Sequence, residues 1–140
     1  NEAIKYPGLN LLLMGGYFNE QTYAFVGART IEHLGDMAFD MVFLGTTGIS
    51  LTRGLTTNPF FEESIKRCLL SYGREKIALL ADSSKFDKAA LMTFGGLKDV
   101  GYLITEKLPA APYLEAMEAA GVRLLCPERP DGGKGNEDGD

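Results

Sequence analysis

Residues 77–86 read IALLADSSKF, an apolar run that ends in a short polar turn containing both an acid and a base. The run predicts a buried strand, and the turn after it would lie at the carboxyl edge of a sheet, where open α/β proteins collect their ligands. Asp82 could accept from a sugar hydroxyl, and Lys85 could meet a phosphate as a point charge. The same pattern is also typical of a capped turn, in which Asp82 satisfies backbone donors and Lys85 is solvated.

Further β-type runs alternate with helical patterns along the chain. The expected strands are 9–14, 23–26, 39–44, 77–81, 101–105 and 122–126, and the helical patterns are 58–73, 88–94 and 112–120. Alternation of this kind is typical of an α/β fold with a mainly parallel sheet and helices on both faces. The run 9–14 reads as a buried strand that ends at Gly15 and Gly16, a tight turn where the backbone could approach a ligand.

Composition narrows the class of protein and of partner. A chain of 140 residues with 45% hydrophobic content suits one domain with a real core. The net charge is −5, and five acids against two bases lie after Pro127. The remainder therefore offers no general basic surface for nucleic acid. We expect one α/β domain over residues 1–127, incomplete at its N-terminus, followed by a disordered acidic tail over 128–140.

Cysteine, histidine and hydropathy patterns set the expected cofactors and compartment. Two cysteines far apart in sequence and a single histidine cannot build a zinc site, so we expect no structural metal and no cofactor. The chain opens without a signal-peptide pattern, and no apolar run approaches the length that spans a bilayer. A reducing cytoplasm and no membrane partner are expected.

Residues 45–58 form a segment rich in hydrogen-bond donors. They include five threonines, one serine, three glycines and Arg53, and no carboxylate. Arg53 is the only cation there, which makes it a phosphate candidate, although a solvated loop arginine fits equally well. The helix expected after Asn58 carries Glu62 and Glu63 in its first turn, where the positive end of the helix dipole favours acids.

Several of these runs, taken in order, resemble the C-terminal sensor domain of the DeoR family of bacterial transcriptional regulators. The matching runs are Gly15-Gly16, FLGTTGI (43–49), GLT (54–56) and DSSKF (82–86), with Glu62 and Lys66 as the family's helical E-x-x-x-K pair. The resemblance covers about residues 6–126. Asp87 stands where the family usually carries Gly, and Gly101 and Glu106 stand at the two aspartate positions of its V-D-x-I-I-T-D strand.

The resemblance implies a sugar-phosphate effector at the carboxyl edge of a Rossmann-like sheet, in a fold related to ribose-5-phosphate isomerase and coenzyme A transferases. Residues 45–48 would donate hydrogen bonds to the sugar. The side chains of Lys66 and Lys85 would neutralise the phosphate or organise the pocket. Asp82 would accept from the sugar hydroxyls or hold Lys85. The candidate ligand-binding residues are Gly15, Gly16, Gly45, Thr46, Thr47, Gly48, Arg53, Lys66, Asp82 and Lys85. Thr46 and Thr47 could instead serve the turn backbone, and Lys66 could simply pair with Glu62 one helical turn away.

The resemblance also implies partners. DNA would be bound only through an N-terminal winged helix-turn-helix. In the family this part is followed by a strand and a Gly-Thr-Thr phosphate-binding loop, both upstream of the first run matched here. This sequence contains neither the helix-turn-helix nor that upstream loop. Effector binding would alter the arrangement of subunits in a homo-oligomer. An unpaired sheet edge left by the missing strand would also favour self-association.

Two other functions remain open from the sequence. The related isomerases need a carboxylate base on the loop that corresponds to 45–58, and this loop has no acid, so we expect binding without chemistry. An isomerase-like enzyme would have to use Asp82 with Lys85 as its acid–base pair. The third possibility is an oligomerisation module that binds no ligand.

Overall fold

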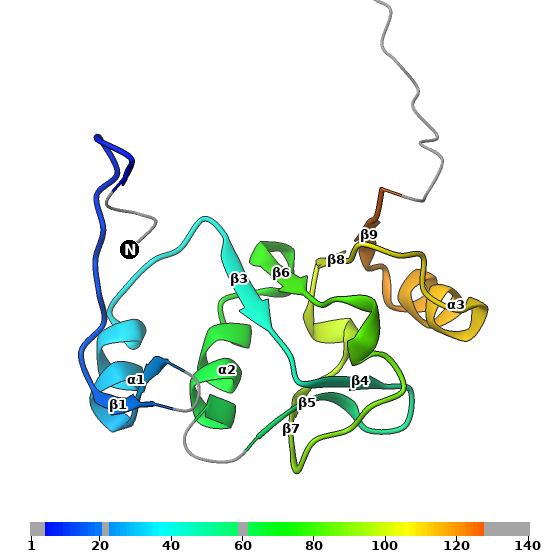
Figure 1. The fold of residues 1–140 in the computed structure, drawn as a ribbon, viewed down its shortest axis with the longest axis horizontal. Helices are drawn as coiled ribbons and strands as arrows, with labels where there is room; N and C mark the ends of the chain where they lie inside the picture. The colour runs from blue at the N-terminus through cyan, green and yellow to red at the C-terminus, as the bar shows by residue number, and fades with distance from the viewer. Residues whose placement is uncertain (1–4, 21–22, 59–61, 128–140) are drawn as a thin grey trace, which may run out of the picture.

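The computed structural model describes residues 5–20, 23–58 and 62–127, and its centre is a parallel sheet (Figure 1). The strands are β3 (Val42–Gly45), β6 (Ile77–Leu80), β8 (Tyr102–Ile104) and β9 (Arg123–Leu125), in the order β3-β6-β8-β9. These strands confirm the apolar runs read from the sequence and the α/β class. The predicted tail, 128–140, lies outside the described residues.

One face of the parallel sheet carries the core. Side chains alternate across a strand, so Leu44, Leu79 and Leu103 lie in one register row on the same face, and each is at most 4% exposed. Helix α3 (Ala111–Ala120) adds Tyr113 and Met117 to this cluster. The helix ends at Gly121, which caps it in the left-handed conformation at φ 67°.

The opposite face of the sheet is more open. The side chains of Phe43, Leu80 and Leu125 lie on this face and are 62%, 44% and 45% exposed. Strand β3 is also at one edge of the sheet and has no strand beyond it within the described residues. Apolar side chains and unpaired backbone groups thus reach the surface at this side of the molecule.

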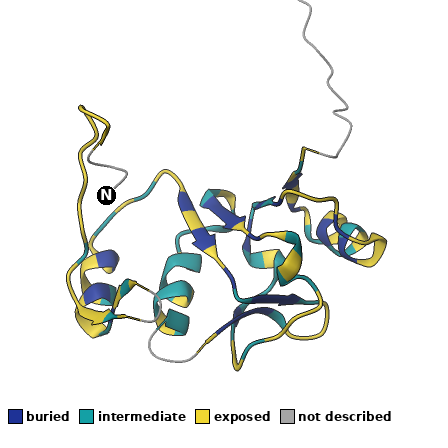
Figure 2. Cartoon of the chain, in the orientation of Figure 1, coloured by how far each residue is buried: buried dark blue, intermediate teal, exposed yellow. Residues whose placement is uncertain are grey.

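A second, antiparallel sheet packs on the same core. It consists of β4 (Gly48–Ser50), β5 (Gly54–Thr57) and β7 (Met92–Gly95), and Figure 2 shows β4 and β5 largely buried. The helical pattern predicted for 88–94 is therefore wrong. Thr93 pairs with Thr56 of β5 in the sheet. The Ala90 N–H also donates to the Thr56 Oγ1 at 2.8 Å. The segment therefore forms a strand because it pairs with β5, although its apolar spacing suits a helix.

The N-terminal part differs most from expectation. The buried strand predicted for 9–14 is wrong: the segment has no regular structure, and Leu11, Leu12 and Leu13 are 56%, 70% and 71% exposed. A parallel strand needs neighbours to pair its backbone groups, and no described strand pairs with this segment. The chain continues into a hairpin of β1 (Tyr17–Asn19) and β2 (Ala24–Val26), followed by α1 (Ala28–Gly35).

Helix α2 (Glu62–Leu70) joins the N-terminal part to the sheets. It confirms the helix expected after Asn58, while 59–61 lie outside the described residues. Its apolar stripe is half-buried rather than fully buried, with Leu69 and Leu70 against the core cluster. Tyr72, just beyond the helix, donates its hydroxyl to the Leu34 carbonyl of α1. No helix in the described ranges is long and apolar enough to cross a membrane.

Candidate functional site

The carboxyl ends of the parallel strands meet in one register row. Gly45, Leu80, Ile104 and Leu125 are successive partners across β3, β6, β8 and β9. The residues that follow each strand therefore gather at one edge of the sheet. This confirms the prediction that the Asp82 turn lies at the carboxyl edge.

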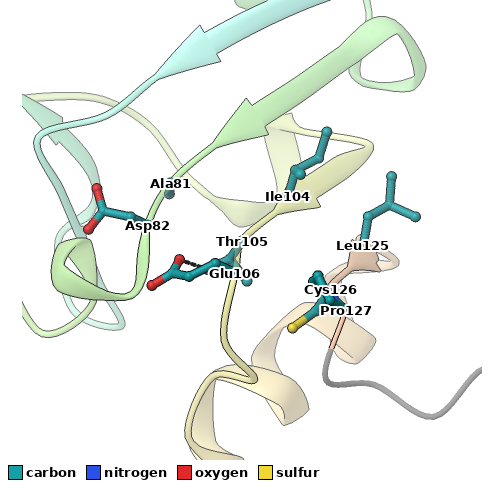
Figure 3. Close-up of a pocket in the computed structure, with 8 residues that line it drawn as sticks. All are labelled: Ala81, Asp82, Ile104, Thr105, Glu106, Leu125, Cys126 and Pro127. Carbon is teal, nitrogen blue, oxygen red and sulfur yellow. Dashed lines mark hydrogen bonds between the residues drawn. The ribbon is translucent and has the colours of Figure 1, made fainter.

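An open cavity of about 570 Å³ lies at this edge (Figure 3). Figure 3 shows the carboxylates of Asp82 and Glu106 on one side of it and Leu125 and Cys126 on the other. The lining residues are Ala81, Asp82, Ile104, Thr105, Glu106, Leu125, Cys126 and Pro127. Only Asp82 was among the candidate residues from the sequence. The others could have been found from their positions at the ends of the runs 77–81, 101–105 and 122–126.

The Asp82 turn is both a capped turn and an accessible site. The Asp82 carboxylate accepts from the Ser84 N–H at 2.9 Å, and hydrogen bonding to the Ser84 side chain first, and to this N–H second, lowers the pKa of Asp82. Lys85 Nζ lies 3.8 Å from Asp82 Oδ2, and the two side chains are 35% and 55% exposed. The capping interpretation is therefore correct for the backbone, while both charged groups stay open to solvent and to a ligand.

Glu106 links the end of β8 to the same turn. Its two carboxylate oxygens accept from the Ser83 N–H at 3.0 and 2.9 Å, and Thr105 Oγ1 lies 3.2 Å from one of them. Hydrogen bonding from the Ser83 side chain is the largest cause that lowers the pKa of Glu106 to about 2, ahead of the bond from the Ser83 N–H. The carboxylate is thus ionised at neutral pH and already committed to the turn backbone, a role that the sequence did not indicate.

The threonine loop that follows β3 is held largely by its own hydrogen bonds. Thr46 is 8% exposed, and its hydroxyl lies 2.9 Å from the carbonyl oxygens of both Gly48 and Thr56. Thr47 is half-buried, and its N–H donates to the Thr56 carbonyl at 3.0 Å. A Cβ at Gly48 would come within 2.4 Å of the Lys88 carbonyl oxygen, so the close packing there requires glycine. Of the two alternatives for Thr46, the structure favours service to the turn backbone.

Lys66 lies between helix α2 and the second sheet. Its Nζ donates to Thr57 Oγ1 at 2.9 Å, lies 3.5 Å from the Glu62 carboxylate, and is 5.3 Å from the centre of the Phe94 ring. Burial lowers the pKa of Lys66, and the charge and hydrogen bond of Glu62 offset part of that effect. The contacts match the interpretation of Lys66 as the ion-pair partner of Glu62. Its other partner, Thr57, directly follows Thr56, whose carbonyl accepts from the threonine loop.

The remaining candidates lie elsewhere. Arg53 is in the turn between β4 and β5, at the opposite end of that hairpin from Gly48, and it donates to the Leu91 carbonyl at 2.9 Å. The Gly15 carbonyl accepts from Thr30 Oγ1 at 2.9 Å, next to α1. Helix α1 and strand β1 lie at one end of the molecule and α3 at the other (Figure 1). The structure therefore does not bring Gly15, Gly16 or Arg53 to the cavity edge.

The described ranges contain no candidate metal site. No three His, Cys, Asp or Glu side chains come together there in a way that could hold an ion.

Comparison with known proteins identifies the family. A family model described as the DeoR C-terminal sensor domain matches residues 1–107. The chain belongs to the DeoR sensor-domain family. This confirms the resemblance seen in the order of the sequence runs. Two of the four matching runs, FLGTTGI and DSSKF, lie at the carboxyl ends of β3 and β6, and GLT lies in β5, which pairs with β4.

Curated relatives of this DeoR sensor domain are transcriptional regulators. The putative aga operon transcriptional repressor of Escherichia coli O157:H7 is 30% identical over 89% of this chain and 46% of its own length. The HTH-type transcriptional repressor GlcR of Bacillus subtilis is 29% identical over 89% of this chain and 48% of its own length. The HTH-type transcriptional regulator GlpR of Haloferax volcanii is 32% identical over 81% of this chain and 44% of its own length. The chain spans about half the length of these relatives. Since the family and its relatives are regulators, the prediction that the chain is not an enzyme is confirmed.

Proposed function

We propose that this DeoR sensor domain binds a phosphorylated sugar or polyol at the carboxyl edge of the parallel sheet. The observation that carries the proposal is the convergence of three loops at one edge: Gly45–Gly48, Asp82–Lys85 and Thr105–Glu106. Asp82, Thr105 and Glu106 line an open cavity large enough for a small metabolite, and the 45–48 loop follows β3, the neighbouring strand of the sheet. A relative from Haemophilus influenzae, 29% identical over 82% of this chain, is named a glycerol-3-phosphate regulon repressor.

Charge suggests how such a ligand would be oriented. Asp82 and Glu106, both with lowered pKa values, put negative charge at the cavity. Hydroxyl groups would donate to these carboxylates, whereas a phosphate would be repelled by them. The phosphate would therefore lie toward Lys85 and the 45–48 loop. Thr46 and Lys66 would hold that loop and the neighbouring strand in place rather than contact the ligand.

We further propose that the domain works in a homo-oligomer of a longer regulator in the bacterial cytoplasm. DNA would be bound by a separate helix-turn-helix part, as the names of the HTH-type relatives suggest. The exposed apolar residues Phe43, Leu80 and Leu125 on the open face, together with the edge of β3 that no described strand pairs with, offer a surface for association. The sensing unit would comprise residues 1–127, and the acidic segment 128–140 would lie outside it. Light scattering should show a dimer or larger species; a monodisperse monomer would contradict this part.

A thermal-shift panel tests ligand binding. Glucose 6-phosphate, fructose 1-phosphate and glycerol 3-phosphate are compared with glucose, fructose and glycerol. A ligand at 100 times its Kd stabilises the native state by about 2.7 kcal/mol, so one phosphorylated compound should raise the Tm while its unphosphorylated form does not.

Variants connect the shift to the site. Asp82→Asn and Lys85→Met should each weaken the effective compound at least about tenfold, because each removes a charged contact worth more than 1.4 kcal/mol. Lys98→Met, on an exposed lysine after β7, is the matched control. Full binding by both site variants would remove the two residues from the site. If no compound raises the Tm, the result would favour the alternative of an oligomerisation module that binds no ligand.

A further inference from the structure

Asp87 has an unusual backbone directly after the DSSKF turn. Its φ is 56°, in the left-handed region that glycine adopts freely and other residues uncommonly. An aspartate held in this conformation needs compensating contacts from the surrounding structure.

Tyr113 of α3 supplies those contacts. Its Oη accepts from the Asp87 N–H at 3.0 Å and lies 2.8 Å from Asp87 Oδ1 and 3.1 Å from the Ile49 carbonyl oxygen. The residue is 3% exposed, and burial raises the pKa of its phenol, which therefore keeps its proton at neutral pH. One buried hydroxyl thus bonds to the turn after β6 and to strand β4.

The ring of Tyr113 strengthens the same connection. It packs edge to face on Phe86, with ring centres 5.0 Å apart. Phe86 in turn forms an isolated parallel bridge with Ile49. The two loops assigned to the ligand, the one that ends at Gly48 and the one that contains Lys85, are therefore joined through contacts that converge on Tyr113.

We propose that Tyr113 is a positioning residue of the effector site, which fixes the Asp82–Asp87 turn against β4 and so sets the distance between Lys85 and the Gly45–Gly48 loop. The residue lies in α3, beyond the part matched by the family model. Asp87 and Tyr113 act as a pair: the hydroxyl compensates for an aspartate at a position that suits glycine. The effect on ligand affinity rests on the proposed function, whereas the effect on the turn does not.

Hydrogen exchange followed by NMR tests the effect on the turn. The readout is the Lys85 amide, which donates to the Asp82 carbonyl at 3.0 Å and does not touch Tyr113. Tyr113→Phe removes only the hydroxyl and should accelerate exchange of this amide at least fivefold. Tyr113→Phe with Asp87→Gly should restore it, because glycine adopts the left-handed backbone without help. Tyr102→Phe, on β8, is the control and should change nothing at Lys85.

Ligand affinity provides the second readout. For whichever of glucose 6-phosphate, fructose 1-phosphate or glycerol 3-phosphate stabilises the wild type, Tyr113→Phe should raise the Kd at least fivefold, and the double variant should bring it back. Unchanged Lys85 exchange in Tyr113→Phe, or no rescue by Asp87→Gly, would overturn the positioning role. If none of the three probes binds the wild type, the proposed function fails, and the exchange comparison still decides whether Tyr113 fixes the turn.

Discussion

Replacing Lys66 by methionine separates its two possible roles. Methionine keeps most of the aliphatic volume and removes the charge. In the structure Lys66 pairs with Glu62 and donates to Thr57, and the Lys66 and Glu62 side chains are only 17% and 16% exposed. The substitution would leave the Glu62 carboxylate in a mostly buried place without its cation, although Thr57 Oγ1 would still donate to it at 3.1 Å.

The expected loss of stability follows from this burial. Breaking a buried ion pair by removing one partner costs about 3–5 kcal/mol. Because both side chains keep some contact with water and Thr57 remains as a donor, we expect the lower end, about 3 kcal/mol. For a domain of this size that corresponds to a fall in Tm of roughly 10–15 °C.

A double variant distinguishes a lost pair from lost packing. Glu62→Gln with Lys66→Met removes both charges and should return to within about 1 kcal/mol of the wild type, because no unpaired charge stays buried. Urea denaturation followed by circular dichroism gives the free energies of unfolding, with Lys98→Met as the control. If Lys66→Met is as stable as the wild type but loses affinity for the effective sugar phosphate, the structural argument is refuted and Lys66 is a ligand contact.

Two further predictions concern stability. Gly16→Ala should cost about 1–3 kcal/mol, because its Cβ would come within 2.4 Å of Thr30 Oγ1 and 2.7 Å of a backbone carbonyl, whereas Gly15→Ala meets nothing within 4 Å and should be nearly neutral in the same urea assay. Glu106→Gln should lower the urea midpoint at pH 7. Since the folded pKa of Glu106 is about 2, below its ordinary 4.5, its stabilisation is present above pH 4.5 and lost toward pH 2. A gap between wild type and Glu106→Gln that is the same at pH 7 and pH 2.5 would show that its charge is not responsible.

The strands of the central sheet could be predicted because their signal is local. The runs at β6, β8 and β9 are short, apolar and bounded by turn residues, and each of these properties is visible within a few positions. In a parallel sheet the residue after each strand must fall at the same edge. The sequence was therefore sufficient to place Asp82 and Lys85 at the carboxyl edge and to indicate the family.

Elements whose partners are distant were beyond this reasoning. Apolar spacing over 88–94 suited a helix, but the segment forms a strand because β5 offers unsatisfied backbone groups beside it. The run 9–14 has the composition of a buried strand, yet it is exposed because no described strand pairs with it. Local pattern reports what a segment can form, and its neighbours determine what it does form.

The candidate site shows the same division. Amino-acid type and order determined that an acid, a base and a donor-rich loop would meet at one edge of an α/β sheet. Only the tertiary structure decided which of these groups are already engaged: Thr46 with carbonyl groups, Lys66 with Glu62, and Glu106 with Ser83, 23 positions earlier. The contact of Tyr113 with Asp87 spans 26 positions. Hydrogen bonds over such separations depend on how helices and sheets pack, and that packing leaves no periodic trace in the sequence.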